Sequence, residues 1–246
     1  MTYRHRSVVA AAAIALALIA SSCAPSASPP HNPAAFVEGQ PYAPAFEVAN
    51  FSDPLVNDYF PLEPGLTAVF EGGDERVEVT VTAETRVVMG VTTHVITDQV
   101  FVDGELQEDT VDWYAADNFG NVWYFGEETA EYEGGEIVST EGSWEAGVDG
   151  AQPGIIMLAD PEVGDAYRQE FYAGEAEDVA RVYAVDESIT TPVGMWTLVI
   201  VTEDWSELTP EVRERKWYAP LAGVVFEETV QGGSGTLSLV DLTRTP

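Results

Sequence analysis

The chain has 246 residues, of which 42 are acidic and only 10 are Lys or Arg, so its formal net charge is −32. A surface of this charge repels nucleic acid and anionic lipid headgroups, and we therefore exclude both as binding partners. The acidity favours solubility in salty or acidic surroundings, and it leaves open the attraction of cations or basic ligands.

The first 22 residues have the pattern of an export signal. Arg4 and Arg6 precede an unbroken apolar run from Val8 to Ala20, which is long enough for a signal-peptide core and too short to span a bilayer. Ser21-Ser22 and Cys23 follow, and Cys23 is the only cysteine of the chain. Without the two signal arginines, 8 basic side chains face 42 acidic ones, a formal charge of −34.

Small residues before a cysteine at the end of an apolar run resemble the bacterial lipobox, although Ala20 stands where that motif usually has Leu. The resemblance implies a signal peptide over residues 1–22, a diacylglycerol on the thiol of Cys23, and a membrane partner reached through that anchor on the outer face of the cell membrane. The alternative is ordinary signal-peptidase cleavage nearby, which would release a soluble protein with an unpaired thiol. Residues 23–50 are rich in Pro, Ala and Ser and predict a disordered tether behind the anchor.

Residues 51–246 predict one all-β, antiparallel domain. Short runs rich in β-branched and aromatic residues alternate with Gly, Asp and Pro turns, and no segment has a sustained helical stripe. Residues 77–82 alternate with period two, and Asp103-Gly104 reads as a two-residue hairpin turn. The prolines of residues 57–65 favour an edge or lead-in segment.

Two stretches of this domain resemble each other. Trp113-Tyr114-Ala115 matches Trp217-Tyr218-Ala219, and the segment that begins at Gly90 matches the one that begins at Gly194 at the same spacing. The match predicts a duplicated meander, with copies near residues 64–128 and 163–228 and an insert that carries short extra strands near 137–139 and 143–145. Because so many strands cannot stay flat, we expect a curved sheet, a half-barrel, a barrel or two packed layers.

The segments 57–65, 121–127 and 218–225 resemble a family of uncharacterised bacterial exported lipoproteins over most of residues 57–240. That family implies no activity for this chain. The meander with its closing Tyr-Ala-Pro…Gly-Val hairpin is also similar in architecture to half-barrel envelope lipoproteins of the lipid-carrier type, a resemblance that implies acyl-chain binding on a concave face.

Aromatic residues gather in the two matched hairpins. Neighbours in a strand point to opposite faces, so one set would fill the core and the other would line a concave face. We take Trp113, Trp123 and Trp217 as candidate ligand-facing aromatics and an apolar small molecule as the candidate partner. Core packing alone accounts for at least half of the aromatic side chains.

Catalytic and zinc-binding residues are scarce. His94 is the only histidine of the domain, no Gly-x-Ser-x-Gly turn is present, and Cys23 belongs to the export signal. The two-residue turn would place His94 opposite Trp113, Gln99 opposite Glu108 and Asp98 opposite Asp109. Facing carboxylates are destabilising unless they are solvated, protonated or bridged, so Asp98 and Asp109, with Glu108 or Asp112 nearby, form a weak candidate calcium site. A wrong register or a solvated pair is the alternative.

No other cofactor is expected, and residues 117–121 favour a hairpin turn over a calcium loop. Three functions remain open. The first is a non-enzymatic, lipid-anchored envelope protein that binds an apolar or amphiphilic ligand. The second is an acidic module for surface interaction or cation binding, and the third is a carboxylate-dependent hydrolase, for which the sequence selects no pair of residues.

Overall fold

The computed structural model describes residues 31–245 and is all-β and antiparallel, as the sequence predicts. One four-residue 3-10 helix, η1 (Val48–Phe51), is the helical element of this part of the chain. Across residues 31–245 no helix has the length and apolarity needed to cross a bilayer.

The first half of the sheet is built from long strands followed by short ones. They are β1 (Leu66–Gly72), β2 (Glu75–Val88), β3 (Val91–Val102), β4 (Glu105–Ala116), β5 (Val122–Glu133), β6 (Glu136–Ser139), β7 (Trp144–Glu145) and β8 (Gln152–Met157). The second half begins with short strands. They are β9 (Ala166–Arg168), β10 (Glu170–Phe171), β11 (Asp178–Thr191), β12 (Gly194–Ser206), β13 (Arg213–Ala219), β14 (Gly223–Gln231) and β15 (Thr236–Arg244).

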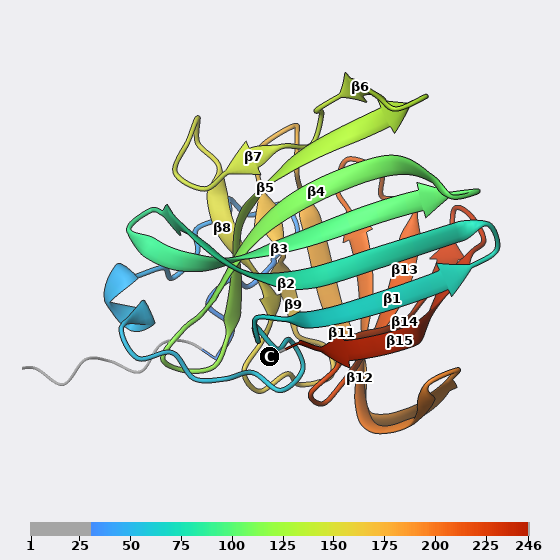
Figure 1. The fold of residues 1–246 in the computed structure, drawn as a ribbon. Coiled ribbons are helices and arrows are strands. Elements are labelled where there is room, and N and C mark those ends of the chain that lie inside the picture. The colour runs from blue at the N-terminus through green and yellow to red at the C-terminus, as the bar shows by residue number, and fades with distance from the viewer. Residues whose placement is uncertain (1–30, 246) are drawn as a thin grey trace, which may run out of the picture.

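The strands form one sheet that is nearly closed into a barrel. Its order is β10-β8-β5-β4-β3-β2-β1-β15-β14-β13-β12-β11-β9, with β6 and β7 paired to β5. Figure 1 shows the teal to yellow-green β1–β5 as one wall and the orange and red β11–β15 as the facing wall, joined where β1 pairs with β15. The two ends of the sheet, β10 and β9, are consecutive in the chain, which brings the edges together at Gln169.

The β3–β4 hairpin confirms the predicted turn and corrects the predicted register. Asp103 and Gly104 have φ of 52° and 83°, as a two-residue hairpin turn requires. Phe101 still pairs with Leu106, but Val100 pairs with Glu108, so Gln107 is an extra residue in a β-bulge. Every pair beyond the bulge is therefore shifted by one residue.

The predicted lead-in segment and insert strands are confirmed, because between residue 31 and Leu66 no strand begins and both β6 and β7 form in the insert. The two predicted copies contain the same succession of hairpins: β2–β3 corresponds to β11–β12, and β4–β5 to β13–β14. The long strands β2 and β11 both carry bulges, which bend a strand and help the sheet to curl. Duplication as the origin of this arrangement stays a prediction.

The predicted tether is wrong for its second half. Ala34 is fully buried, Ala35 forms a β-bridge with Tyr167, and the backbone N–H of Phe36 donates to the carbonyl of Ala166 at 2.9 Å. Phe46 then packs edge-on against Trp123 of β5 at 5.7 Å. We call residues 33–51 the N-terminal segment. It covers the edge of β9 that is not paired with β11, and it covers the outer face of β5 (Figure 1). Residues 23–30 lie outside the described residues.

Candidate functional site

A cavity of about 170 Å³ lies inside the barrel, between β1–β4 on one side and β13–β14 on the other. Its polar lining consists of Asp98, Asp112, Tyr114, Lys216, Tyr218 and Glu227. Its apolar lining consists of Phe60, Pro61, Leu66, Ala68, Phe70, Val79, Val81, Ile96, Ile156, Ala222, Gly223 and Val224.

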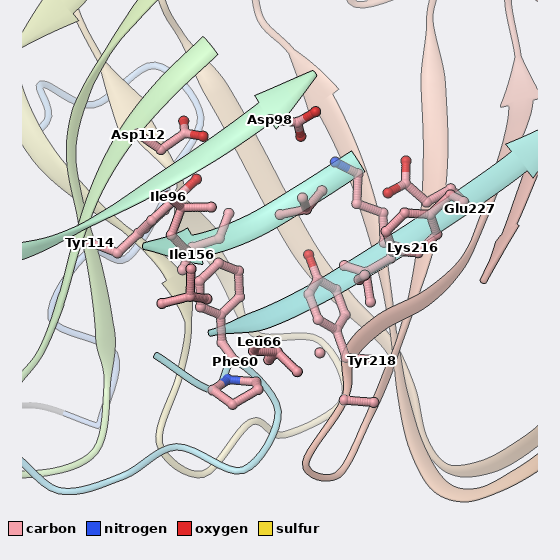
Figure 2. Close-up of a pocket in the computed structure, with 18 residues that line it drawn as sticks. Phe60, Leu66, Ile96, Asp98, Asp112, Tyr114, Ile156, Lys216, Tyr218 and Glu227 are labelled. Carbon is pink, nitrogen blue, oxygen red and sulfur yellow. The ribbon is translucent and has the colours of Figure 1, made fainter. Parts of the chain in front are cut away.

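The lining has two levels, because residues two apart in a strand point to the same face. On β3, Asp98 and Ile96 both line the cavity, and on β4 Asp112 is followed in the same way by Tyr114. Figure 2 shows the charged groups at one end of the cavity and Ile96, Phe60 and Leu66 toward the other. The cavity is therefore charged at one end and apolar at the other.

On β13 the charged group of the upper level is Lys216, followed two residues later by Tyr218. Lys216 is the only lysine of the chain. The neighbouring carboxylate of Glu227 raises the pKa of Lys216 well above its ordinary value, so its ammonium stays charged. Figure 2 shows the amine of Lys216 at the same end of the cavity as Asp98 and Glu227.

The two aspartates of the charged level are held in a water-poor environment. Burial, reinforced by the charge of Asp112, raises the pKa of Asp98 to about 8. Burial, reinforced by Glu127, raises the pKa of Asp112 to about 7. The Oδ1 atom of Asp98 is buried without a hydrogen-bond partner among the described residues. Each group would gain from a donor or a positive charge brought into the cavity.

A polar network extends from the cavity along β5. The hydroxyl of Tyr124 lies 2.6 Å from Oδ1 of Asp112 and 3.0 Å from Oε2 of Glu127. One hydroxyl proton cannot be donated to both carboxylates, so both contacts are hydrogen bonds only if one carboxyl carries a proton. Burial raises the pKa of Glu127 to about 7, which fits that requirement. Tyr124 also stacks on Tyr114, with ring centroids 4.5 Å apart, and so links the network to the cavity wall.

The lead-in segment closes the apolar end of the cavity. The amide of Asn57 donates to the carbonyls of Gly120 and Leu158, and the backbone N–H of Leu221 donates to the carbonyl of Asp58. Phe60 lines the cavity and also lines a second hollow of about 480 Å³ on the other side of the segment. Phe60 and its neighbour Pro61 line both spaces and thus lie between them, with Phe60 as the larger of the two side chains.

The three tryptophans predicted to face a ligand do not line either space. Trp113 is buried under the guanidinium of Arg86, whose Cζ lies 3.9 Å from the ring centroid. Trp123 is buried and donates its Nε1 hydrogen to Asp117 at 2.9 Å. Trp217 packs edge-on against Phe226 at 5.1 Å. These positions correct the prediction: in the matched pairs Trp113-Tyr114 and Trp217-Tyr218 it is the tyrosine that lines the cavity, while neither Trp123 nor Tyr124 lines it.

The predicted pair of Asp98 and Asp109 does not form. The bulge at Gln107 places Thr110 opposite Asp98, and Gln99 opposite Asp109, with the amide of Gln99 donating to Asp109 at 3.0 Å. Since Asp98 faces the cavity, the next pair along the strand faces the other way. The calcium interpretation of this pair loses its basis, and within residues 31–245 no three His, Cys, Asp or Glu side chains are grouped as metal ligands.

His94 and Asp117, which the sequence analysis also considered, do not line this cavity. His94 pairs with Tyr114 instead of Trp113, is half-buried, and has its pKa lowered by burial. Asp117 accepts hydrogen bonds from the backbone of Phe119 and Asn121, as a hairpin turn needs. Cys23 lies outside the described residues.

Sequence reasoning did not find Lys216, Phe60, Tyr114 or Tyr218 as lining residues. One signal was available, since a single lysine in so acidic a chain is a candidate for a buried role. Which residue of a matched Trp-Tyr pair faces the cavity depends on the β-bulges, and the hydrophobic pattern of the sequence does not predict where these bulges lie.

The chain matches no family model and no curated protein. It is similar to the crystal structure of a protein from Bacteroides fragilis, provisionally described as exported and with a YmcC-like fold, at 12% identity and a TM-score of 0.44, over 78% of this chain and 99% of that one. It is also similar to a protein from Parabacteroides distasonis, provisionally described as a lipoprotein, at 13% identity and a TM-score of 0.42, over 77% of this chain and all of that one.

Proposed function

We propose that this protein is an exported bacterial lipoprotein, anchored through Cys23 to the outer face of the cell membrane, that binds a small amphiphile inside its barrel without catalysing a reaction. The cavity, with its charged level above an apolar level, is the observation that carries the proposal of ligand binding. The signal pattern and the lone cysteine support the proposed location.

The two levels of the cavity suit the two parts of an amphiphile. Apolar atoms of a ligand would be removed from water against Ile96, Leu66 and Phe60, while its polar group would reach Asp98 and Asp112. Sites for drug-sized ligands usually have about 300–1,000 Å³, so the smaller cavity fits a short amphiphile or one end of a longer one.

Native mass spectrometry of the protein purified from membranes tests ligand binding. We expect a bound small molecule in the natural protein and its loss in Ile96→Trp, because the larger ring would fill the apolar level. Val87→Trp is the matched control, since Val87 is 65% exposed on the neighbouring strand β2 and its side chain lies away from the cavity. Two results together would contradict the proposal. The natural protein would show only the mass of the free chain, and short amphiphiles would bind Ile96→Trp and Val87→Trp with equal affinity.

Replacement of the cysteine tests the proposed location. Cys23→Ser removes the thiol that would receive the lipid, and we expect the protein to leave the membrane fraction. Metabolic labelling with a palmitate analogue should mark the natural protein and leave Cys23→Ser unlabelled. Unchanged membrane retention of Cys23→Ser would refute lipid anchoring.

A further inference from the structure

We propose that the cavity selects an organic cation, a protonated amine on a short apolar chain, with the ammonium between Asp98 and Asp112 and the carbon chain on the apolar level. This inference rests on the proposed function and names the chemical class of its ligand. It is carried by the distribution of charge in the lining, by the unpartnered oxygen of Asp98 and by the register of β3 and β4.

The charged level has more carboxyl groups than cations. Asp98, Asp112 and Glu227 line the cavity, and Lys216 is the one basic side chain among the described lining residues. The charge of Glu227 is the main cause of the raised pKa of Lys216, and the charge of Lys216 also acts on Asp98, so one ammonium serves several carboxyl groups. Among residues 31–245, no Lys or Arg nitrogen forms an ion pair within 4 Å of Asp98 or Asp112.

Asp98 presents an unused acceptor to the cavity. Its Oδ1 is buried and accepts no hydrogen bond from the described residues, although buried polar atoms are normally paired. An uncharged hydroxyl would supply a donor, but only a cation supplies a donor and also offsets the repulsion between neighbouring carboxylates.

The register places the second carboxylate within reach of the same ammonium. Asp98 is paired with Thr110, so Asp112 is its diagonal neighbour on the inner face of β3 and β4. Diagonal neighbours in antiparallel strands are about 7–8 Å apart at the backbone, a separation that two carboxylates and a bridging ammonium can span. An ammonium has three N–H donors, enough to serve both aspartates at once.

The level below is suited to the carbon chain of such a ligand. Tyr114 and Tyr218 contribute aromatic side chains from opposite walls, and Ile96 and Leu66 contribute aliphatic surface. Burial of the carbon chain against these side chains would remove apolar surface from water.

Calorimetric titration with hexylamine, hexanol and hexanoate tests the inference. The protein is the full chain with Cys23→Ser, so that no detergent competes for the cavity. We expect hexylamine to bind at least about tenfold more tightly than hexanol, because only the ammonium stabilises the ionised form of the two aspartates. Hexanoate should bind most weakly, because it has no N–H donor and adds a further negative charge to the charged level. Asp98→Asn should remove about tenfold of the affinity for hexylamine and leave hexanol nearly unchanged.

Asp109→Asn is the matched control, because Asp109 lies on the other face of the neighbouring strand and should leave all three affinities unchanged. A second measurement is proton release. The groups that act on Asp98 from the surrounding strands are Asp112, Glu108, Glu227 and Lys216, and together with burial they leave Asp98 largely protonated at pH 7. Hexylamine binding should therefore release protons, seen as a dependence of the binding heat on the ionisation enthalpy of the buffer.

The outcomes separate the two proposals. Equal affinity for hexylamine and hexanol, or a preference for hexanoate through Lys216, would overturn the selection of a cation while leaving ligand binding in place. Failure of all three probes to bind the natural cavity would overturn both proposals. Tight hexylamine binding that is unaffected by Asp98→Asn and Asp112→Asn would place the amine elsewhere and also overturn this inference.

Discussion

Asp98 is the residue at which the fold and the proposed site make opposite demands. A carboxyl group with a buried, unpartnered oxygen destabilises the folded chain when it is ionised, yet it is the ionised form that would attract a cation. Residues that serve a ligand are often kept at some expense of stability. Stability measured against pH therefore reports on this residue independently of any ligand.

The pKa of Asp98 predicts the sign of that dependence. Its folded value of about 8 lies above the ordinary value of 3.8, so the folded state holds more protons than the unfolded state between these limits. The contribution of Asp98 to the free energy of unfolding is fully present below about pH 3.8 and is lost as the pH rises toward 8, with Asp112 and Glu127 adding to the slope up to about pH 7. Asp98→Asn should stabilise the protein at pH 8 by on the order of 1 kcal/mol.

Urea unfolding at pH 5, 6.5 and 8 measures this effect. The difference between Asp98→Asn and the natural protein should grow with pH, because only the natural protein must ionise a buried carboxyl. Asp109→Asn, on the outward side of the hairpin, should show no such growth. A constant difference across the three pH values would disprove the assignment of the slope to Asp98.

At the scale of one residue, composition could predict that aromatic side chains would line a concave face, but not which ones. Trp113 and Trp217 are the bulkier members of their pairs and fill space outside the cavity, so Tyr114 and Tyr218 line it. Alternation along a strand separates the two members of each pair without deciding which one turns inward. That decision depends on the packing of the whole barrel.

At the scale of elements, the turn of the β3–β4 hairpin is predictable from the sequence and its strand register is not. The Asp-Gly turn is a strong local signal and was predicted correctly, while the bulge at Gln107 has no comparable signal. A shift of one residue exchanges the partner of every later residue. The predicted metal site depended on that register and was lost with it, whereas the strands themselves were predictable.

The lead-in segment should control the length of ligand that the barrel accepts. Phe60 separates the cavity of about 170 Å³ from the outer hollow of about 480 Å³, so Phe60→Ala should connect them. We expect Phe60→Ala to bind dodecylamine more tightly than the natural protein does, because added methylene groups would be buried. Calorimetric titration with hexylamine and dodecylamine measures the change.

Leu55→Ala is the control for Phe60→Ala, since Leu55 lines the outer hollow without touching the cavity. It should leave the affinity for both amines unchanged. Loss of all binding in Phe60→Ala, with its secondary structure intact, would show that the ring is part of the site and not a divider.

The N-terminal segment should contribute to stability in spite of its tether-like composition. Phe46 packs against Trp123 and Phe125 of β5, with ring centroids 5.7 and 5.8 Å away. Phe46→Ala should lower the free energy of unfolding by about 2 kcal/mol, less than the about 3–5 kcal/mol usual for a buried aromatic side chain, because Phe46 is only partly buried. Val37→Ala, at a 59% exposed position of the same segment, should cost little.

Chemical unfolding followed by tryptophan fluorescence measures both variants, since Trp123 lies directly beneath Phe46. Equal stability of Phe46→Ala and Val37→Ala would mean that the segment does not hold to the barrel in solution. The composition of the segment could not reveal this packing, because its few aromatic residues are separated by prolines and small residues.

At the scale of the whole molecule, charge is the dominant property. Beyond residue 22 the chain has a formal charge of −34, and such self-repulsion destabilises a compact state. The melting temperature should therefore rise between about 20 mM and about 300 mM NaCl, as the screening length falls. Thermal unfolding followed by circular dichroism measures the rise.

The identity of the salt distinguishes screening from binding. NaCl and KCl should act equally at equal ionic strength, because screening does not depend on the identity of the cation. A much larger rise with CaCl2 at matched ionic strength would favour specific cation binding instead. Absence of any rise would show that the acidic side chains are already well separated on the surface.

The architecture of the whole molecule was largely accessible from the sequence, and its closure was not. Alternating strands, the absence of helical stripes and ten or more expected strands predict a curved antiparallel sheet. The junction between β9 and β10 depends on strands of three and two residues, too short to have a period of their own. Such elements form only because long-range contacts hold them.

The place where the N-terminal segment joins β9 has a consequence for what the protein can encounter. Ala34 is fixed beside the barrel, and ten residues of chain lie between it and Cys23, a contour length of at most about 40 Å. A domain lipidated at Cys23 would therefore work in a layer about as deep as the bilayer is thick. Within that layer, molecules that escape from the membrane are met at a high local concentration, and those free in the surrounding medium are not.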